Sequence, residues 1–328
     1  MFFFFAAFVF TGFLAAQSPY PFAWGTDSSQ EVRPVFPAAF FNSFIEAQRA
    51  RDAAMPYWVP SERESIAMAQ NSPFESILLN NDILLYYGHP MSRNMGILGR
   101  YNPEEQKKML LDLAAEYREA GGRSMIPGFY IIYGTVWPGG EIGIIRNSVI
   151  REWIDFTLKN DMLMFLDHQM GRYDPVDSLR VLLPYLRYPN VHLALDPEWR
   201  TSRPMQEIGY LTAAEINRLQ AVMEDYMIEN NIPGERLLVI HQFHPRMIHN
   251  RDDIRTDFSK VRLVLFMSGI GSPRVKRDTY AFGARAENIP VKGFKLWYNL
   301  GIPHYDDPLM SPREVLNLNP RPYIIMYQ

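Results

Sequence analysis

Short apolar runs recur along most of the chain and alternate with polar segments. Eight such runs follow residue 80, at residues 82–90, 125–135, 161–169, 191–199, 236–245, 261–269, 293–299 and 322–328. Their starts lie roughly 25–45 residues apart, which is the spacing of strand–helix units repeated in a parallel sheet. The pattern therefore predicts an α/β fold with eight strands.

The polar segments between the runs carry helix-start signals. The sequence NPEE at residues 102–105 combines a capping residue, a proline at the first helical position and a glutamate three residues after the cap. The predicted helix ends at the glycine pair 121–122. TAAE at residues 212–215 and SPRE at 311–314 repeat the same capping box. Three such boxes between apolar runs indicate helices placed between strands and argue against an all-β chain.

Eight strands in about 250 residues are typical of a closed (β/α)8 barrel. The main alternative is a doubly wound open sheet, which usually carries a glycine-rich phosphate turn after its first strand. The sequence YYGHPMSRNMGILG that follows the first run lacks the G-x-G-x-x-G spacing of that turn. We therefore predict a single (β/α)8 TIM barrel over residues 80–328.

The N-terminal segments do not follow this rhythm. Residues 1–16 form an apolar run that ends in small residues, as in a secretory signal peptide with cleavage after Ala15 or Ala16. No basic residue precedes the run, so an uncleaved N-terminal anchor is the alternative, and both predict a secreted or cell-envelope-associated protein. Residues 17–79 are rich in proline, serine and aromatic residues and predict an irregular leader with one short helix within residues 38–55.

Composition narrows the functions that need to be considered. The chain has 328 residues, a formal net charge of −3 and no Lys/Arg-rich run, which argues against a nucleic-acid partner. It contains no cysteine, which excludes disulfides, zinc–thiolate sites and cysteine nucleophiles. The sequence leaves the oligomeric state open.

The barrel prediction places candidate chemistry at one end of the strands, because the active sites of such barrels lie at the carboxyl ends. The polar residues at that end of the runs are His89, Tyr133, Asp167, His168, Gln169, Asp196, Glu198, His241, Gln242, His244, Ser268, Lys295, Trp297, Tyr327 and Gln328. The opposite ends of the runs are plain turns such as GGRSM and PGE. This asymmetry predicts a functional face.

Three carboxylates form the strongest group. Asp196 and Glu198 are two residues apart, so they point to the same side if the strand continues. Asp167 ends the preceding strand, and neighbouring strands are about 4.8 Å apart. Crowded carboxylates raise the pKa of at least one member, and glycoside cleavage needs a protonated carboxyl beside an ionised one. The structural alternative is that Asp196 caps a turn while Glu198 pairs with an arginine.

Aromatic residues near the same strand ends favour a sugar, because flat rings stack on the C–H faces of a pyranose. The Asp-x-Glu at the end of the fourth run and the tryptophan late in the barrel resemble secreted (β/α)8 glycoside hydrolases, namely chitinases and the lysozymes of glycoside hydrolase family 25. The runs YYGHP, GFKLWYN and PYIIMYQ also resemble a group of uncharacterised secreted bacterial proteins with that fold. Chitinases carry the longer motif D-x-x-D-x-D-x-E, whereas the positions before Asp196 are apolar here, with Leu193 and Ala194 among them.

The resemblance implies Glu198 as proton donor with Asp196 as its neighbour. We therefore expect a secreted glycan-cleaving enzyme that needs no cofactor and no metal. Its general acid would be Glu198, and Asp196 or Asp167 would be the nucleophile, base or stabilising carboxylate. The predicted substrate contacts are Tyr87, His89, Tyr133, His168, Gln169, Trp199, His241, Gln242, Lys295 and Trp297.

Two other functions stay open. A metal-dependent barrel hydrolase or isomerase would draw its ligands from His89, Asp167, His168, Glu198, His241 and His244. No H-x-H ends the first strand and no H-E-x-x-H lies on a helix, so this pattern is weaker. A non-catalytic barrel could use the same carboxylates only to hydrogen-bond the hydroxyls of a glycan.

Overall fold

The structure is a computed structural model that describes residues 76–78 and 81–328. The predicted signal peptide or anchor, and the predicted helix within residues 38–55, lie outside the described residues. Within the described part of the chain, no helix is both long and apolar enough to cross a membrane.

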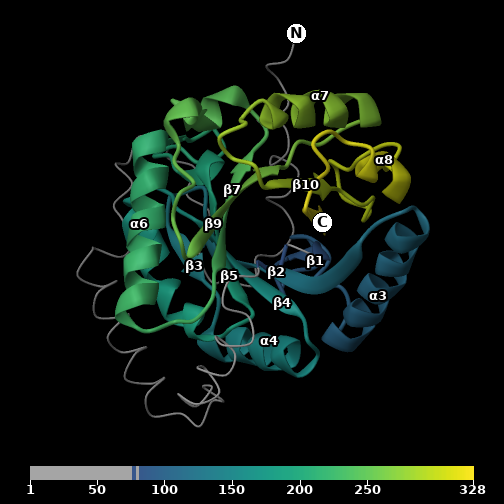
Figure 1. Cartoon of the computed structure of the whole chain (residues 1–328), viewed down its shortest axis with the longest axis horizontal. Helices are drawn as coiled ribbons and strands as arrows, with labels where there is room; N and C mark the ends of the chain where they lie inside the picture. Colours follow the sequence, from purple (N-terminus) through teal and green to yellow (C-terminus); the bar gives the residue numbers. More distant parts are fainter. Residues whose placement is uncertain (1–75, 79–80) are drawn as a thin grey trace.

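Eight parallel strands close into a barrel. They are β1 (Asn81–Gly88), β2 (Ser124–Val136), β4 (Leu163–Gln169), β5 (Val191–Asp196), β7 (Arg236–Gln242), β9 (Val261–Met267), β10 (Lys292–Leu296) and β11 (Ile324–Tyr327). The first strand pairs with β2 on one side and with β11 on the other, which closes the sheet (Figure 1). A short strand, β3 (Ile142–Ile144), adds antiparallel to the end of β2. The predicted (β/α)8 barrel is confirmed.

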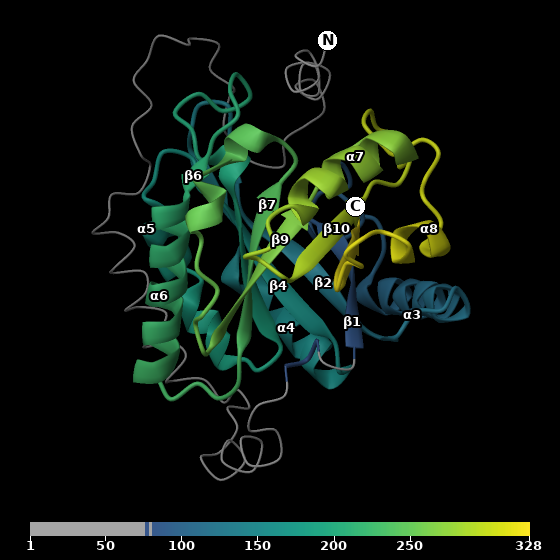
Figure 2. The same cartoon turned by 45° about the horizontal axis from the view of Figure 1, so that its top comes forward.

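Helices surround the strands and form the outer layer (Figure 2). They are α3 (Pro103–Glu119), α4 (Asn147–Lys159), α5 (Pro175–Arg180), α6 (Ala213–Glu229), α7 (Pro273–Ala284) and α8 (Pro312–Leu316). All three predicted capping boxes are present, at the starts of α3, α6 and α8. At α3, for example, the Glu105 amide donates to the Asn102 side chain at 2.9 Å, while the Asn102 amide donates to the Glu105 carboxylate at 3.0 Å.

Alternation along the strands creates two apolar layers. One set of side chains, including Tyr130, Phe165 and Val239, fills the inside of the barrel. The other set, including Phe129 and Leu166, packs between the strands and the helices. Because neighbouring residues in a strand point to opposite faces, these two sets determine which polar residues at the strand ends face inward.

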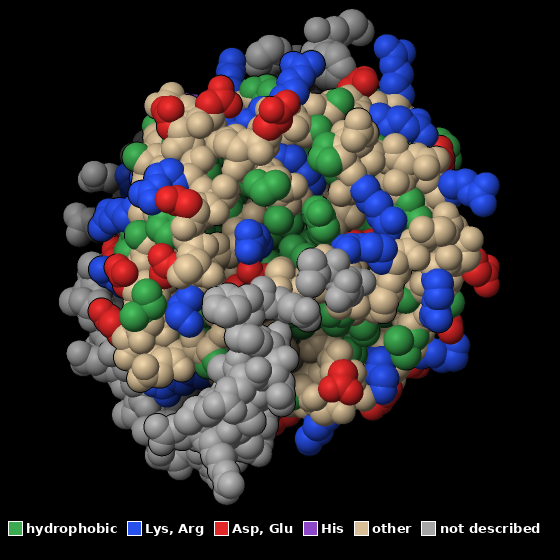
Figure 3. Space-filling model, viewed as in Figure 1, with side chains coloured by type: hydrophobic (Ala, Val, Ile, Leu, Met, Phe, Trp, Pro, Cys, Tyr) green, Lys and Arg blue, Asp and Glu red, His purple; other side chains and the backbone are tan. Residues whose placement is uncertain are grey.

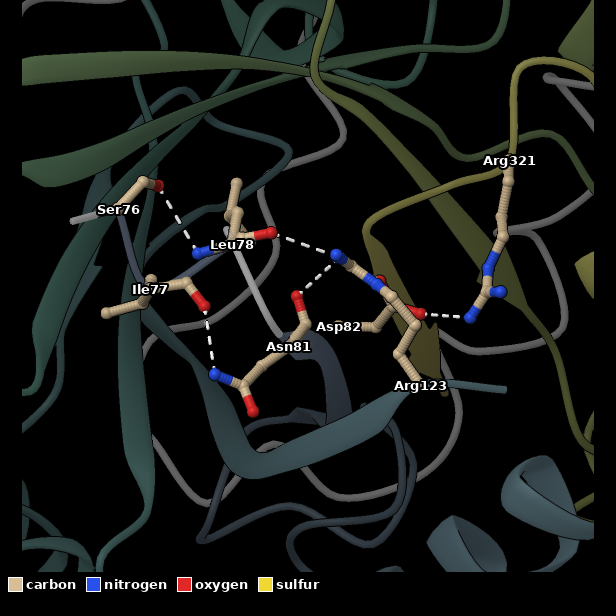
Figure 4. A network of polar contacts seen from close by, with 7 residues as sticks. All are labelled: Ser76, Ile77, Leu78, Asn81, Asp82, Arg123 and Arg321. Carbon is tan, nitrogen blue, oxygen red and sulfur yellow. Dashed lines mark hydrogen bonds and ion pairs between the residues drawn. The ribbon is translucent and has the colours of Figure 1, made fainter. Parts of the chain in front are cut away.

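An ion cluster lies at the amino-terminal ends of three barrel strands (Figure 4). The Asp82 side chain is 1% exposed, and Arg123 donates to its Oδ1 through both Nε at 3.0 Å and a terminal nitrogen at 2.6 Å. Arg321 binds its Oδ2. Arg123 also donates to the carbonyls of Leu78 and Asn81, at 3.0 and 2.7 Å. The cluster therefore joins the starts of β1, β2 and β11 to the segment that precedes the barrel.

The surface carries charges of both signs. Figure 3 shows lysine, arginine, aspartate and glutamate side chains spread around one face of the molecule, with hydrophobic side chains nearer its centre. No single-sign field dominates this face, in keeping with the near-neutral net charge.

Candidate functional site at the carboxyl ends of the strands

Inward alternation brings four predicted residues together at the carboxyl end of the barrel. Asp167 lies two residues after the inward-facing Phe165 on β4, and Asp196 lies two residues after the inward-facing Ala194 on β5, so both face inward. His241 lies two residues after the inward-facing Val239 on β7, and Lys295 lies near the end of β10. These four residues are at most 4% exposed. Polar groups buried to this degree normally have partners, so each contact of the cluster is informative.

Asp167 and Asp196 lie side by side. One oxygen from each and one ring nitrogen of His241 all lie within 4.8 Å of one another. His241 Nε2 is 3.7 Å from Asp196 Oδ1. Neither oxygen of Asp167 accepts an oriented hydrogen bond from any described residue, although the side chain is fully buried. Burial and the neighbouring charge of Asp196 make the ionised form costly, so this arrangement favours a protonated Asp167.

Glu198 joins the group by a route that differs from the sequence expectation. The strand ends at Asp196, and Pro197–Trp199 form a turn of 3-10 helix, so Asp196 and Glu198 are not successive same-side residues of one strand. The Glu198 carbonyl accepts from the Gly209 amide at 2.8 Å. A Cβ at position 209 would meet the Arg200 carbonyl oxygen at 2.4 Å, so only glycine permits this close approach. The turn nevertheless leaves the Glu198 carboxyl close enough to Asp196 for their ionisation to be linked.

Burial and proximity separate the ionisation of the three carboxyls. Burial, reinforced by the charge of Asp196, holds the pKa of Asp167 and of Glu198 well above the ordinary range. Burial also raises the pKa of Asp196, to about 6, while Lys295 and Asp167 limit the rise. The shared site therefore favours the protonated forms of Asp167 and Glu198 beside Asp196.

Lys295 is the cation opposite these carboxyls. Its Nζ is 3.7 Å from the centre of the Tyr87 ring and 4.3 Å from that of Trp297, which places the ammonium between two aromatic faces. Burial lowers the pKa of Lys295 to about 8, and the nearby acids Asp196 and Asp167 oppose the shift. At neutral pH the positive charge of Lys295 therefore balances the ionised Asp196.

Tyr130 and His241 complete the inward-facing group. The Tyr130 hydroxyl lies 2.6 Å from His241 Nε2. Burial, with a further contribution from Lys295, holds the pKa of His241 well below its ordinary value, so the imidazole is neutral. The sequence analysis missed Tyr130 because it lies within an apolar run. Tyr130 is two residues before Ile132 on β2, so the two side chains point into the barrel together, and this spacing could have identified it.

Tyr133 and His168 were expected to contact substrate, but they lie on the other face of the strands. Tyr133 belongs to the apolar layer between strands and helices, and its ring centre is 5.9 Å from that of His168 and 5.8 Å from that of Tyr185. His168 follows the inward-facing Asp167 directly, so its side chain must point outward. Neither residue is therefore part of the inward-facing group.

Gln169 and Gln242 use their amides for structural bonds. The Gln169 side-chain oxygen accepts from the Val136 amide at 2.8 Å and so holds the end of β2. The Gln242 oxygen accepts from Arg251 at 3.1 Å, and its nitrogen donates to the His244 carbonyl at 3.3 Å. These contacts position loops around the barrel end and leave the central cluster to other residues.

Three further predicted residues lie in the loops after the strands. His89 follows β1, its Nδ1 accepts from the Met91 amide at 3.2 Å, and burial lowers its pKa to about 4. Trp199 is partly buried against the outer apolar layer. The Trp297 ring is partly exposed beside Lys295, and its Nε1 donates to the Ser268 carbonyl at 3.3 Å. Of these three, Trp297 contacts a member of the central cluster, because its ring lies against the Lys295 ammonium.

The arrangement can support two kinds of chemistry. It can transfer protons, because carboxyls with raised pKa values lie beside one another. A carboxylate oxygen of Asp167, one of Asp196 and a ring nitrogen of His241 could also bind a divalent cation. The nearby ammonium of Lys295 opposes that second use, since it would repel a cation.

Comparisons with known proteins add little to this picture. No protein-family model matches the sequence, and no curated protein matches it. One solved structure with a similar arrangement is a family 18 chitinase from Crocus vernus, with a TM-score of 0.38 and 10% identity, covering 75% of this chain and 92% of that chain. A likeness this distant says nothing about the reaction of this chain, and the barrel is established by its own strand pairing.

Proposed function

We propose that the protein is a glycoside-hydrolase-like enzyme that cleaves a glycan by carboxylate acid–base chemistry. The observation that carries the proposal is the grouping of three carboxyls at the barrel end, where burial raises the pKa of each, that of Asp196 to about 6. We infer that Asp196 is ionised while Asp167 and Glu198 hold protons. Glycoside cleavage needs this combination, because the leaving oxygen must be protonated while negative charge stabilises the oxocarbenium-like transition state.

Glu198 is assigned as the general acid. Residue 198 as a whole is partly exposed, whereas Asp167 and Asp196 are buried, so we assign contact with the leaving group to Glu198. One of its oxygens, Oε2, is buried without a hydrogen-bond partner among the described residues. Asp196 is assigned as the ionised partner, acting on the anomeric carbon directly or through water. Asp167 keeps its proton beside Asp196 and limits the repulsion between the two.

Aromatic and basic side chains supply the proposed binding surface. Trp297 and Trp199 are partly exposed, and an aromatic ring at such a position can stack on a pyranose. Tyr87 holds Lys295 in place, at 3.7 Å from ammonium to ring centre, and Lys295 keeps Asp196 ionised. The protein is also proposed to be exported or attached to the cell envelope, on the basis of residues 1–16 alone.

The test of this proposal is the Glu198→Gln variant, assayed for release of reducing ends from a panel of polysaccharides and peptidoglycan. Loss of the general acid should lower turnover by about 10²–10⁴-fold while binding of the glycan survives. Glu229→Gln is the matched control, because Glu229 is exposed at the end of α6, where the chain leads into the amino-terminal end of β7. Equal turnover by Glu198→Gln and wild type would refute the assignment.

The same assay separates the enzyme from a non-catalytic glycan-binding barrel. A non-catalytic barrel would be retained on a glycan affinity column and would release no reducing ends. Glu198→Gln would then change only the strength of binding. Measurable turnover by the wild type that the variant loses supports the enzyme.

A metal-dependent hydrolase is the second candidate, favoured by the convergence of Asp167, Asp196 and His241 within 4.8 Å. Titration calorimetry with Zn²⁺ or Mn²⁺ on chelator-treated protein tests it. The glycosidase proposal expects no stoichiometric binding, since Lys295 already balances the charge of Asp196. Tight one-to-one binding that His241→Ala abolishes would favour the metal-dependent enzyme instead.

A further inference from the structure

A second buried ion pair lies beside the carboxyl cluster, and nothing in the sequence pattern marks it. Lys276 on α7 and Asp306 in the loop after β10 are 1% and 0% exposed at their side chains, with Lys276 Nζ 3.1 Å from Asp306 Oδ2. Burying two charges costs free energy unless each finds several partners. The partners of this pair are therefore its most informative feature.

Lys276 binds the backbone at the ends of two neighbouring strands. Its ammonium donates to the carbonyl of Gly269, after β9, and to the carbonyl of Lys295 on β10. It also lies 4.8 Å from the centre of the Phe294 ring. Lys295, the cation of the carboxyl cluster, is thus held at its main-chain carbonyl by the ammonium of Lys276.

Asp306 holds the next residues of the same strand exit. One carboxylate oxygen accepts from the Trp297 amide at 2.9 Å, and the other accepts from the Gly271 amide at 3.0 Å. The Asp306 amide in turn donates to the Trp297 carbonyl at 2.9 Å. The backbone of Trp297 is therefore fixed at both its donor and its acceptor, and the indole Nε1 is fixed at the Ser268 carbonyl.

We propose that Lys276 and Asp306 form a positioning pair that fixes Lys295 and Trp297 against the carboxyl cluster. The hydrogen bonds of the pair go to the backbone at the exits of β9 and β10, so its influence on the carboxyls passes through Lys295 and Trp297. The pair joins these two exits and the amino-terminal part of α7 into one unit. Its consequence for glycan binding rests on the proposed function, while its effect on Trp297 does not.

The first test uses Asp306→Asn, which keeps the shape of the side chain and removes its charge. With ¹⁵N-labelled protein, the backbone amide and indole resonances of Trp297 should shift, and hydrogen exchange at the Trp297 amide should accelerate by about tenfold or more, because a charge-assisted hydrogen bond is lost. Lys276→Met should shift the same resonances. The Trp297→Phe spectrum assigns them among the six tryptophans of the chain.

Asp82→Asn is the matched control, since Asp82 is an equally buried carboxylate paired with cations at the opposite end of the barrel. It should destabilise the protein without moving the Trp297 resonances. If Asp306→Asn lowers stability but leaves Trp297 exchange and shifts as in wild type, the pair is only structural and the proposal falls.

Activity supplies an independent second measurement. Displacing Lys295 and Trp297 should lower turnover or glycan affinity by about 10–100-fold, as small misplacements at active sites do. A protein in which Trp297 responds as expected, but which processes no glycan even as wild type, would overturn the proposed function and leave the positioning pair standing. Unchanged Trp297 resonances with normal turnover in the variants would overturn the positioning pair alone.

Discussion

The two ends of the barrel bury carboxylates in opposite ways. At the amino-terminal end, Asp82 is bound by two guanidinium groups and both its oxygens are used. At the carboxyl end, Asp167 is equally buried, yet neither of its oxygens accepts an oriented hydrogen bond from a described residue. Buried charges that are paired support folding, whereas crowded carboxyls with raised pKa values are typical of functional sites. The cluster at the amino-terminal end holds the barrel together, and we propose that the carboxyl end is the functional site.

The largest stability effect should come from breaking the amino-terminal cluster. Asp82→Asn leaves Arg123 and Arg321 without their carboxylate at a site that joins three strands. Since both guanidinium groups are partly exposed, we expect a loss of about 2–3 kcal/mol in the free energy of unfolding, somewhat below the cost for a fully buried pair. Urea denaturation at pH 7 measures it. A loss under about 0.5 kcal/mol would be that of an ordinary surface site and would remove this half of the comparison.

The corresponding change at the carboxyl end should have the opposite sign. Asp167→Asn replaces a buried carboxyl that ionises freely in the unfolded chain above the ordinary aspartate pKa of about 4. Because the pKa of Asp167 is raised in the folded protein, this residue lowers the free energy of unfolding above about pH 4, and the loss grows as the pH rises. We expect the variant to gain about 1–2 kcal/mol at pH 7.5 and nothing at pH 4.

Thermal unfolding at the two pH values checks this second prediction. A variant that is less stable than wild type at pH 7.5 would show that Asp167 has stabilising partners after all. The expected gain in stability should accompany a loss of turnover, because sites arranged for chemistry commonly trade stability for function.

A smaller effect is expected from the hydrogen bond between Tyr130 and His241, the inward-facing bond beside the carboxyls. Tyr130→Phe should lower stability by about 1 kcal/mol, because it leaves a buried ring nitrogen without its partner. Tyr117→Phe is the matched control, since the Tyr117 hydroxyl bonds that of Tyr327 at 2.8 Å in the outer layer. Urea titrations of the two variants should give similar losses, while only Tyr130→Phe alters turnover. Equal turnover in both variants would exclude Tyr130 from the site.

The sequence predicted the fold well because its signals are local. Alternating apolar runs and three capping boxes depend only on neighbouring residues, and they suffice to order eight strands and their helices. The strand-end rule also found Asp167, Asp196, His241 and Lys295, because a residue at a strand end needs only the correct parity to face inward.

Parity and turns explain the differences between the predicted and observed sites. His168 directly follows Asp167, so the two cannot face the same side of β4, and the strand-end rule alone does not distinguish them. Glu198 was expected on an extended strand, but Pro197 begins a 3-10 turn that depends on the distant Gly209. The Lys276–Asp306 pair joins a helix to a loop 30 residues later, and no local pattern predicts such a contact.

The most direct test of the account is the titration of the carboxyl groups by NMR of protein labelled with ¹³C at the aspartate and glutamate side chains. We predict a step near pH 6 for Asp196, linked to Asp167, and steps for Asp167 and Glu198 well above the ordinary range of carboxyl groups. Asp167→Asn should remove one of the elevated steps. If all three carboxyls instead titrate at about pH 4, as exposed groups do, the barrel end holds no proton for catalysis and the central claim is wrong.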